Sequence, residues 1–97
     1  MPEDYVIVKH VNDELDTTSE AILKDGTVFY WLYFHNTSGN TIYLSFDGGT
    51  TWKQIAADKT LEITAPTGKL YLSEPLKGKA TAASSTFEML IIQERSS

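Results

Sequence analysis

The chain has 97 residues, a formal net charge of −5 at pH 7 and a hydrophobic content of 41%. A chain of this length buries about 60–65% of its unfolded surface around one core, so we expect a single domain over residues 1–97. The acidic balance disfavours phosphate backbones and anionic lipid, which excludes nucleic acid and membrane surfaces as expected partners. With no cysteine, the chain has neither a disulfide framework nor a thiolate metal site.

The N-terminus carries no pattern of an export signal. Residues 1–4 lack the basic start and the long apolar run of a signal peptide, and the most apolar stretch, residues 28–34, is too short to span a bilayer. We therefore expect a protein made in the cytoplasm, with flexible tails at residues 1–4 and 94–97.

The first strand is predicted at residues 5–11, which are rich in β-branched side chains. Residues 12–20 contain only one apolar side chain, Leu15, and predict an exposed loop. Residues 21–23 predict a short strand that ends at the turn formed by Asp25 and Gly26.

Four carboxylates lie in or beside the predicted loop, at Asp13, Glu14, Asp16 and Glu20. Carboxylate oxygens are ligands that calcium prefers, but the spacing lacks the glycine and the terminal glutamate of an EF-hand loop. Runs of charge are commonly solvated, so we favour a solvated loop and predict no metal site. Whether these side chains bind a cation stays open at this stage.

Residues 28–34 read Val-Phe-Tyr-Trp-Leu-Tyr-Phe and predict a strand that is apolar on both faces. Neighbouring side chains in a strand point to opposite faces, so seven such residues cannot all lie on one side. Either two layers enclose this strand, or one of its faces is a surface between subunits. The candidate interface residues are Phe29, Trp31, Tyr33, Tyr43 and Tyr71.

Residues 41–52 predict a β-hairpin. Ile42, Leu44 and Phe46 alternate with their neighbours at the period of two that is typical of a half-buried strand. The Asp-Gly-Gly sequence at residues 47–49 reverses the chain, since glycine permits a positive φ and the carboxylate can accept hydrogen bonds from nearby N–H groups. Trp52 then returns on the second strand, where we expect its ring to anchor the interior.

The second half of the chain predicts further short strands. Residues 60–64 and 69–73 alternate in the same way, and residues 87–92 predict a closing strand, with a helix as the alternative. Residues 77–86 consist almost wholly of Lys, Gly, Ala, Ser and Thr and are expected to be mobile. Seven to nine short strands separated by turns indicate an all-β chain, a single-domain antiparallel β-sandwich with a jelly-roll-like topology.

The sequence contains no recognisable catalytic constellation. His10 and His35 each lie in an apolar strand pattern without a second ligand at metal-binding spacing, which favours packed or edge histidines. There is no nucleophile elbow, no phosphate-binding loop and no His-Glu-x-x-His motif. We predict a protein that is not an enzyme and has no catalytic residue, no cofactor and no metal.

The predicted hairpin carries a known motif. The pattern Ser45-x-Asp47-x-Gly49-x-Thr51-Trp52 resembles the Asp-box, a hairpin of bacterial sialidases and related propellers, at every fixed position. In that family the motif is structural and lies away from the catalytic centre, so the resemblance implies a hairpin and no reaction. The residues of this structural hairpin are Ser45, Asp47, Gly48, Gly49, Thr51 and Trp52.

A second resemblance covers residues 28–93. Small structural proteins of tailed bacteriophages often show an aromatic strand ending in Asn, here Leu-Tyr-Phe-His-Asn at residues 32–36, and then a segment like residues 40–50, Asn-Thr-Ile-Tyr-Leu-Ser-Phe-Asp-Gly-Gly-Thr. A strand like residues 61–63 and a Gly-x-Leu-Tyr strand like residues 68–72 follow in the same order. The resemblance implies an apolar face and strand edges that add to a neighbour.

This second resemblance implies a non-enzymatic virion protein that decorates or cements the capsid, or completes head or tail assembly, through an apolar oligomeric face. The expected partners are capsid or other virion proteins and further copies of the chain, with a trimer as the expected symmetry, and the expected location is the virion. The alternative is a carbohydrate-binding module, in which aromatic side chains stack on a glycan. The aromatic residues available for this are Tyr30, Trp31, Tyr33, Tyr43, Trp52 and Tyr71.

Overall fold

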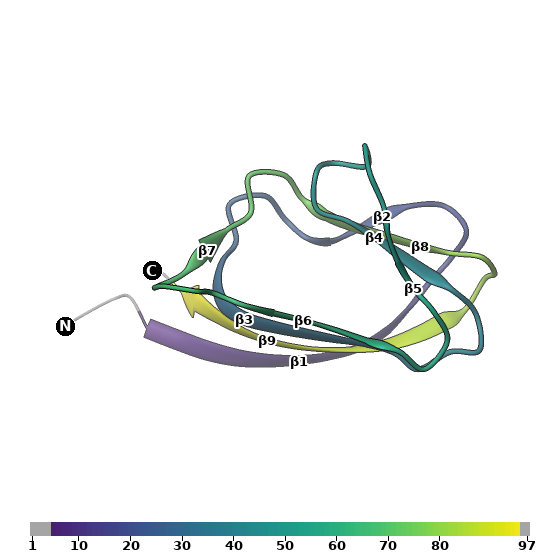
Figure 1. Ribbon diagram of the computed structural model, residues 1–97, viewed down its shortest axis with the longest axis horizontal. Helices are drawn as coiled ribbons and strands as arrows, with labels where there is room; N and C mark the ends of the chain where they lie inside the picture. The colour runs from purple at the N-terminus through teal and green to yellow at the C-terminus, as the bar shows by residue number, and fades with distance from the viewer. Residues whose placement is uncertain (1–4, 96–97) are drawn as a thin grey trace.

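The computed structural model describes residues 5–95, and all regular secondary structure in this range is β-strand. Two antiparallel sheets lie face to face as the lower and upper layers of Figure 1. The strands are β1 (Tyr5–Leu15), β2 (Glu20–Leu23), β3 (Val28–Asn36), β4 (Ile42–Ser45), β5 (Lys53–Ile55), β6 (Thr60–Thr64), β7 (Leu70–Tyr71), β8 (Leu76–Ala80) and β9 (Ser85–Arg95).

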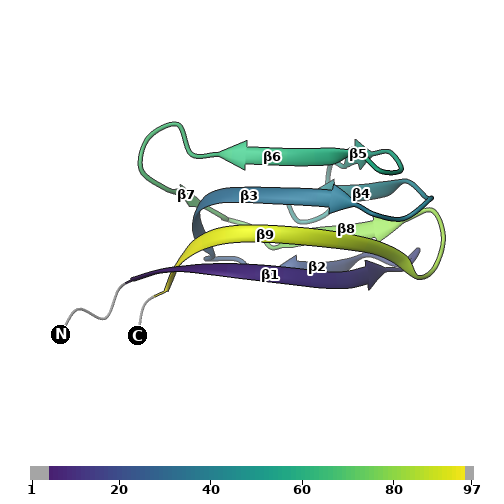
Figure 2. The same cartoon turned by 90° about the horizontal axis from the view of Figure 1, so that it is seen from below.

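The strand order shows how the chain is wound. One sheet has the order β1-β9-β3-β6, with β7 also paired to β3, and the other has the order β2-β8-β4-β5. The chain resembles one long hairpin, in which β1 pairs with β9, β2 with β8, β3 with β6 and β4 with β5. This hairpin is rolled up, so that β9 also pairs with β3 and β8 also pairs with β4 (Figure 2). This is the double-sheet arrangement of a jelly roll. The predicted all-β sandwich with jelly-roll-like topology is confirmed.

Strand β3 resolves the apolar run of residues 28–34. Phe29, Leu32 and Phe34 are buried in the core between the sheets, and Phe34 stacks on Phe87 of β9 with ring centroids 4.9 Å apart. A β-bulge between Phe29 and Trp31 shifts the register against β9, so Tyr30 is an extra residue in β3. The residues between the buried ones are half-buried on the outer face of the sheet. One face is therefore covered by the second layer and the other is not.

Strand β1 is longer than predicted. The prediction of a loop at residues 12–20 is wrong for its first four residues, which belong to β1. Asn12 to Leu15 continue the ladder with β9, with Asn12 opposite Glu88 and Leu15 opposite Ser85. Leu15 is only 1% exposed. The pairing partner lies about seventy residues away in the sequence, so a segment that looks polar by itself completes a strand with one buried anchor.

The prediction of a mobile segment without anchors at residues 77–86 is also wrong. These residues include most of β8, an inner strand of the four-stranded sheet. Leu76, Gly78 and Ala80 point into the core and are buried. A Cβ atom at Gly78 would lie 2.7 Å from Cδ1 of Ile22 and 2.9 Å from Cδ1 of Leu15. The small residues of β8 therefore make room for larger side chains from β1 and β2, which supply the apolar contact that β8 lacks.

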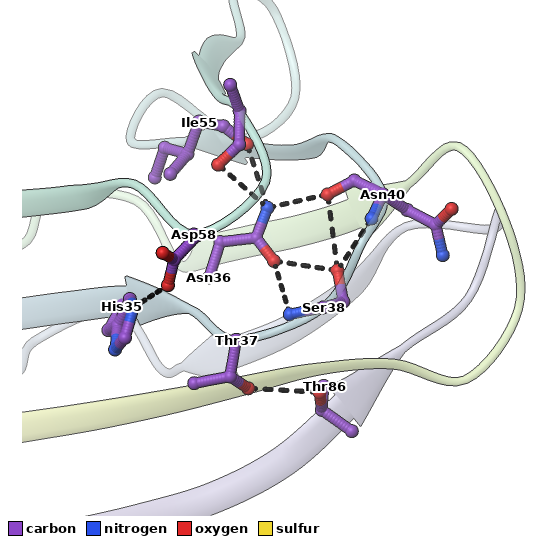
Figure 3. A network of polar contacts seen from close by, with 9 residues as sticks. His35, Asn36, Thr37, Ser38, Asn40, Ile55, Asp58 and Thr86 are labelled. Carbon is purple, nitrogen blue, oxygen red and sulfur yellow. Dashed lines mark hydrogen bonds and ion pairs between the residues drawn. The ribbon is translucent and has the colours of Figure 1, made fainter.

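A buried polar network joins the two sheets at the end of β3 (Figure 3). The side-chain amide of Asn36, which is 0% exposed, donates to the carbonyls of Asn40 (2.7 Å), Ile55 (3.0 Å) and Ala56 (3.2 Å). Its oxygen accepts hydrogen bonds from the backbone N–H and the hydroxyl of Ser38. Because β3 and β5 belong to different sheets, this one side chain ties the sheets together.

The ends of the chain are only partly described. Glu94, expected in a flexible tail, lies in β9, where its carboxylate accepts from Lys69 Nζ at 2.7 Å and from the Tyr30 hydroxyl at 3.5 Å. Arg95, also expected in this tail, is the last residue of β9. The other residues of the predicted tails, 1–4 and 96–97, lie outside the described range. No helix within residues 5–95 is long and apolar enough to cross a membrane.

Candidate functional site

The outer face of the five-stranded sheet carries an unusual concentration of apolar side chains. The ladder pairings set Val8 of β1, Ile92 of β9 and Trp31 of β3 in one row across the sheet. The next row holds His10, Leu90 and Tyr33 in the same order. We call the apolar members of this face, with their neighbour on β1, the outer patch: Val6, Val8, Trp31, Tyr33, Leu90 and Ile92.

The outer patch is accessible to solvent. Val6 and Val8 are 53% and 67% exposed, and the other four side chains are half-buried. The rings of Trp31 and Tyr33 stack along β3 with centroids 5.9 Å apart and planes 9° apart. Isolated exposed apolar residues are normal on a protein. A contiguous apolar group across three strands is different, because its burial against another molecule is favourable.

Polar pairs border the outer patch on the same face. His10 Nε2 lies 2.7 Å from a carboxylate oxygen of Glu88, and His35 Nε2 lies 3.0 Å from a carboxylate oxygen of Asp58 (Figure 3). The indole N–H of Trp31 donates to Glu62 at 2.6 Å. These contacts fix the orientation of the rings, and they surround an apolar centre with a polar rim, as in protein interfaces.

The structure separates the five candidate interface residues. Trp31 and Tyr33 belong to the outer patch, whereas Phe29, 2% exposed in the core, cannot take part in an interface and was wrongly included. Tyr43 lies on β4 in the other sheet, and Tyr71 is 66% exposed on β7. The inclusion of Phe29 fails because the bulge at Tyr30 reverses the expected alternation ahead of Trp31.

The prediction omitted four members of the outer patch, which come from β1 and β9. Val6 and Val8 alternate with inward residues of β1, and Leu90 and Ile92 alternate with Met89 and Ile91 of β9. The alternation was visible in the sequence. What the sequence did not show is that β9 lies between β1 and β3, which brings the three outward-facing rows together.

The predicted hairpin residues run from Ser45, the last residue of β4, to Trp52, just before β5, and the two strands pair as antiparallel neighbours. The Asp47 carboxylate accepts hydrogen bonds from the Thr51 hydroxyl and backbone N–H, the Ser45 hydroxyl and the Thr50 N–H. Gly49 donates to the Ser45 hydroxyl at 2.8 Å, and Gly48 and Gly49 adopt positive φ values of 77° and 102°. Hydrogen bonds from Thr51 first, and then from Ser45 and Thr50, hold the pKa of Asp47 well below its usual range.

Trp52 does not anchor the core, contrary to the prediction. It precedes β5, is half-buried, and lies next to Lys79, whose Nζ is 4.4 Å from the ring centroid. A Cβ atom added to Gly49 would lie 3.7 Å from the Trp52 ring. The indole therefore lies against the hairpin turn and the Lys79 ammonium group on the outside of the four-stranded sheet, where the cation–π contact and the turn replace core packing.

Replacing Asp47 by alanine is expected to lower the thermal unfolding midpoint at pH 7. A carboxyl group whose pKa is depressed in the folded state stabilises the fold above its unfolded pKa of about 3.9 and loses this effect as the pH falls towards the folded pKa. The difference in midpoint between wild type and Asp47→Ala should therefore narrow from about pH 4 downward, as followed by circular dichroism. The control Asp25→Ala changes an aspartate in another exposed turn, and an equal, pH-independent loss in both variants would contradict the assigned role.

The four carboxylates considered for calcium do not form a site. Asp13 and Glu14 are consecutive in β1 and so point to opposite faces, the Asp16 carboxylate accepts from the Ser84 N–H at 3.2 Å, and Glu20 begins β2. Within residues 5–95, no group of three or more His, Asp or Glu side chains is arranged to hold a metal ion.

Comparison with known proteins identifies the fold. No protein-family model and no curated protein sequence matches the chain. A chain from Bacillus endospore appendages, which form disulfide-linked pili, superposes with a TM-score of 0.61 at 12% identity, over 99% of this chain and 90% of that one. A cupin protein from Desulfovibrio desulfuricans gives a TM-score of 0.57 at 11% identity, over 93% and 79% of the two chains.

A viral protein is similar to the same degree. It is a chain of the virus-like particle of the extra small virus of the giant freshwater prawn Macrobrachium rosenbergii. This chain superposes with a TM-score of 0.54 at 8% identity, over 97% of our chain and 80% of the viral one. At these identities the likeness extends to the fold alone. The chain therefore shares a jelly roll with proteins of several kinds, and its function has to be argued from its own surface.

Proposed function

We propose that this chain is a non-enzymatic structural protein of a tailed bacteriophage virion, which decorates or cements the capsid or completes head or tail assembly. The observation that carries the proposal is the outer patch, a solvent-facing apolar surface across β1, β9 and β3. Its partners would be further copies of the chain, as a trimer, together with capsid or other virion proteins.

The comparisons support a role in assembly without defining it. Two proteins of the same fold belong to repeating structures, a viral particle and a pilus. The pili are disulfide-linked, and this chain has no cysteine, so disulfides would not link its copies. The order of motifs over residues 28–93 resembles that of small phage structural proteins, and this resemblance favours the virion among such assemblies.

A protein of this size works by contact area. A specific interface buries about 800 Å² on each partner, with aromatic and aliphatic side chains at its centre and polar groups at its rim. The outer patch offers this arrangement, since Trp31 and Tyr33 are held by contacts with their neighbours before binding and lose little rotamer freedom. Closed rotational symmetry would let each copy cover the patch of the next.

The test is the assembly state of the purified protein by light scattering. The wild type should exceed the mass of a monomer and bind capsid shells, and Val6→Lys with Val8→Lys should weaken association at least about tenfold, because two lysines would be desolvated in the interface. Both valines are more than half exposed, so the fold should tolerate the change.

The control for this test is Gln54→Lys with Ala56→Lys, which adds the same charge on exposed positions at and after β5 in the other sheet. It should assemble like the wild type. A monomeric wild type without affinity for any shell or partner subunit would overturn the proposal.

A carbohydrate-binding module is the second candidate, favoured by the parallel rings of Trp31 and Tyr33 beside the carboxylate of Glu62 on an open sheet face. Aromatic rings stack on sugars, and carboxylates accept hydrogen bonds from their hydroxyls. A glycan array in which wild-type protein binds and Trp31→Ala does not would favour this function, and an array without binding would exclude it.

A further inference from the structure

Strand β1 is the one long edge strand among residues 5–95. It forms a margin of the five-stranded sheet and pairs on one side only, with β9 (Figure 2). It has 11 residues, whereas β2, β5, β6 and β7 have 4, 3, 5 and 2. An edge strand presents backbone N–H and C=O groups that no strand of its own sheet binds, and proteins usually keep such edges short. The open side of β1 is therefore a candidate for pairing with another strand.

The sequence of β1 lacks most of the features that prevent such pairing. It contains no proline or glycine, and its ladder with β9 keeps one register without a bulge from end to end. It does carry two charged side chains on its inner face, Lys9 and Asp13, which line the gap between the sheets together with Val11. Inward charges on an edge strand commonly block pairing, so the effect of these two decides whether the edge is closed or selective.

Lys9 and Asp13 have opposite charges and lie two positions before and two after Val11. Four residues of a strand span about 13 Å, so the two side chains are too far apart to pair with each other. No ion pair within residues 5–95 includes either of them. One carboxylate oxygen of Asp13 accepts from the Glu14 N–H at 2.8 Å, which leaves the other oxygen for a cation. This arrangement is complementary to itself in a strand that runs in the opposite direction.

A single antiparallel register of β1 with another β1 uses this complementarity. When Val11 lies opposite Val11 of the second copy, Lys9 of each copy lies opposite Asp13 of the other. A register centred on Lys9 or on Asp13 places two like charges opposite each other. A register centred on His10 or on Asn12 places Asp13 opposite an apolar residue. The two charges therefore disfavour the other registers and select the one centred on Val11.

We propose that a second copy of this chain pairs with the open edge of β1, antiparallel about Val11 and over residues 7–15, so that two five-stranded sheets become one continuous sheet. About eight to ten main-chain hydrogen bonds would join the copies. On the inner face, Ile7 of each copy meets Leu15 of the other, and Lys9 meets Asp13 on both sides of the twofold axis. The contact uses the edge of the sheet and not its outer face, so it stands whether or not the outer patch closes a trimer.

The test is charge reversal at two exposed positions, which the fold should tolerate. In Lys9→Asp, and equally in Asp13→Lys, like charges lie opposite each other at both ends of the contact. The dissociation constant of the dimer, measured by sedimentation velocity, should rise at least about tenfold in each variant. An equimolar mixture of the two variants restores opposite charges at every position, and so does the double variant. Both should dimerise like the wild type.

The control is Lys53→Asp, which makes the same change of charge on β5, the opposite edge strand of the other sheet. It should leave the dissociation constant unchanged. Rescue in the mixture cannot come from a loss of folding in the single variants, because each chain in the mixture still carries its own substitution.

Hydrogen exchange distinguishes this contact from assembly through the outer patch. In the dimer, the backbone N–H groups of β1 that face away from β9, at alternate residues within 7–15, bind the second copy and should exchange more slowly as the protein concentration rises. A contact between side chains of the outer patch does not bind these amides, and its failure would leave their protection in place. Edge amides of β1 that exchange equally fast at all concentrations, or a mixture of Lys9→Asp and Asp13→Lys that associates no better than either variant alone, would overturn the proposal.

Discussion

Replacing Phe34 by alanine is expected to lower the free energy of unfolding by about 3–5 kcal/mol. Phe34 is fully buried near the middle of the core, and its ring stacks on that of Phe87 at 4.9 Å. The change removes the apolar area of the ring from the core and leaves a cavity that two layers of strands cannot close. Since typical domains are stable by only 5–15 kcal/mol, the variant should be close to unfolding.

Tyr33→Ala is the matched control, because Tyr33 is the preceding residue of the same strand and faces outward. It removes a ring of nearly the same size from a half-buried position, so its cost should be well below that of Phe34→Ala, while it should weaken assembly. Urea unfolding followed by tryptophan fluorescence measures both. If the two variants lost equal stability, the assignment of Phe34 to the inner face and Tyr33 to the outer face would be wrong.

The coupling between Phe34 and Phe87 can be measured separately with a double-mutant cycle. Stacked aromatic pairs contribute about 0.5–1.5 kcal/mol beyond the area they bury. Phe34→Leu, Phe87→Leu and the double variant should therefore show an interaction free energy in this range. Fully additive losses would indicate that the two rings contribute only as apolar volume.

The sequence was sufficient for the fold class because most strands of this chain carry their own alternation. β4 and β6 have apolar residues at every second position, and a turn with two glycines follows β4. The predictions failed where a strand depends on its neighbours. The end of β1 contributes Leu15 alone, and after Leu76 the inward residues of β8 are the small Gly78 and Ala80, so both segments are recognisable as strands only once the distant partners are known.

The outer patch was predictable in part for the same reason. Trp31 and Tyr33 were expected to face a subunit because their strand is apolar throughout, and they do lie outside the core. Val8 and Ile92 carried no such signal, since each belongs to a strand that could have been covered on that side. The order β1-β9-β3 is a property of the whole topology, and no local pattern encodes it.

The position of Trp52 was predicted wrongly for a local reason. A large aromatic residue after a turn favours burial, but the local geometry of the hairpin and Lys79 place its ring on the outside of the sheet.

Replacing Asn36 by leucine is expected to cost about 3–4 kcal/mol of unfolding free energy, although the two side chains have the same number of non-hydrogen atoms. The amide of Asn36 donates to three backbone carbonyls and its oxygen accepts two hydrogen bonds from Ser38 (Figure 3). The substitution leaves the Ile55 carbonyl and its neighbours without this donor in a buried setting, where each unsatisfied group costs about 1–3 kcal/mol. Thermal and urea unfolding measure the loss.

Hydrogen exchange should show where that loss acts. Asn36 connects the end of β3 to the carbonyl of Ile55 in β5, so in Asn36→Leu the amides of β5 should exchange faster than those of β9, which β3 and β1 enclose on both sides. Thr37→Val is the matched control, because it breaks an exposed hydrogen bond of 2.9 Å to Thr86 one residue further along and should cost less than about 0.5 kcal/mol. A similarly small effect for Asn36→Leu would mean that apolar packing alone holds the two sheets together.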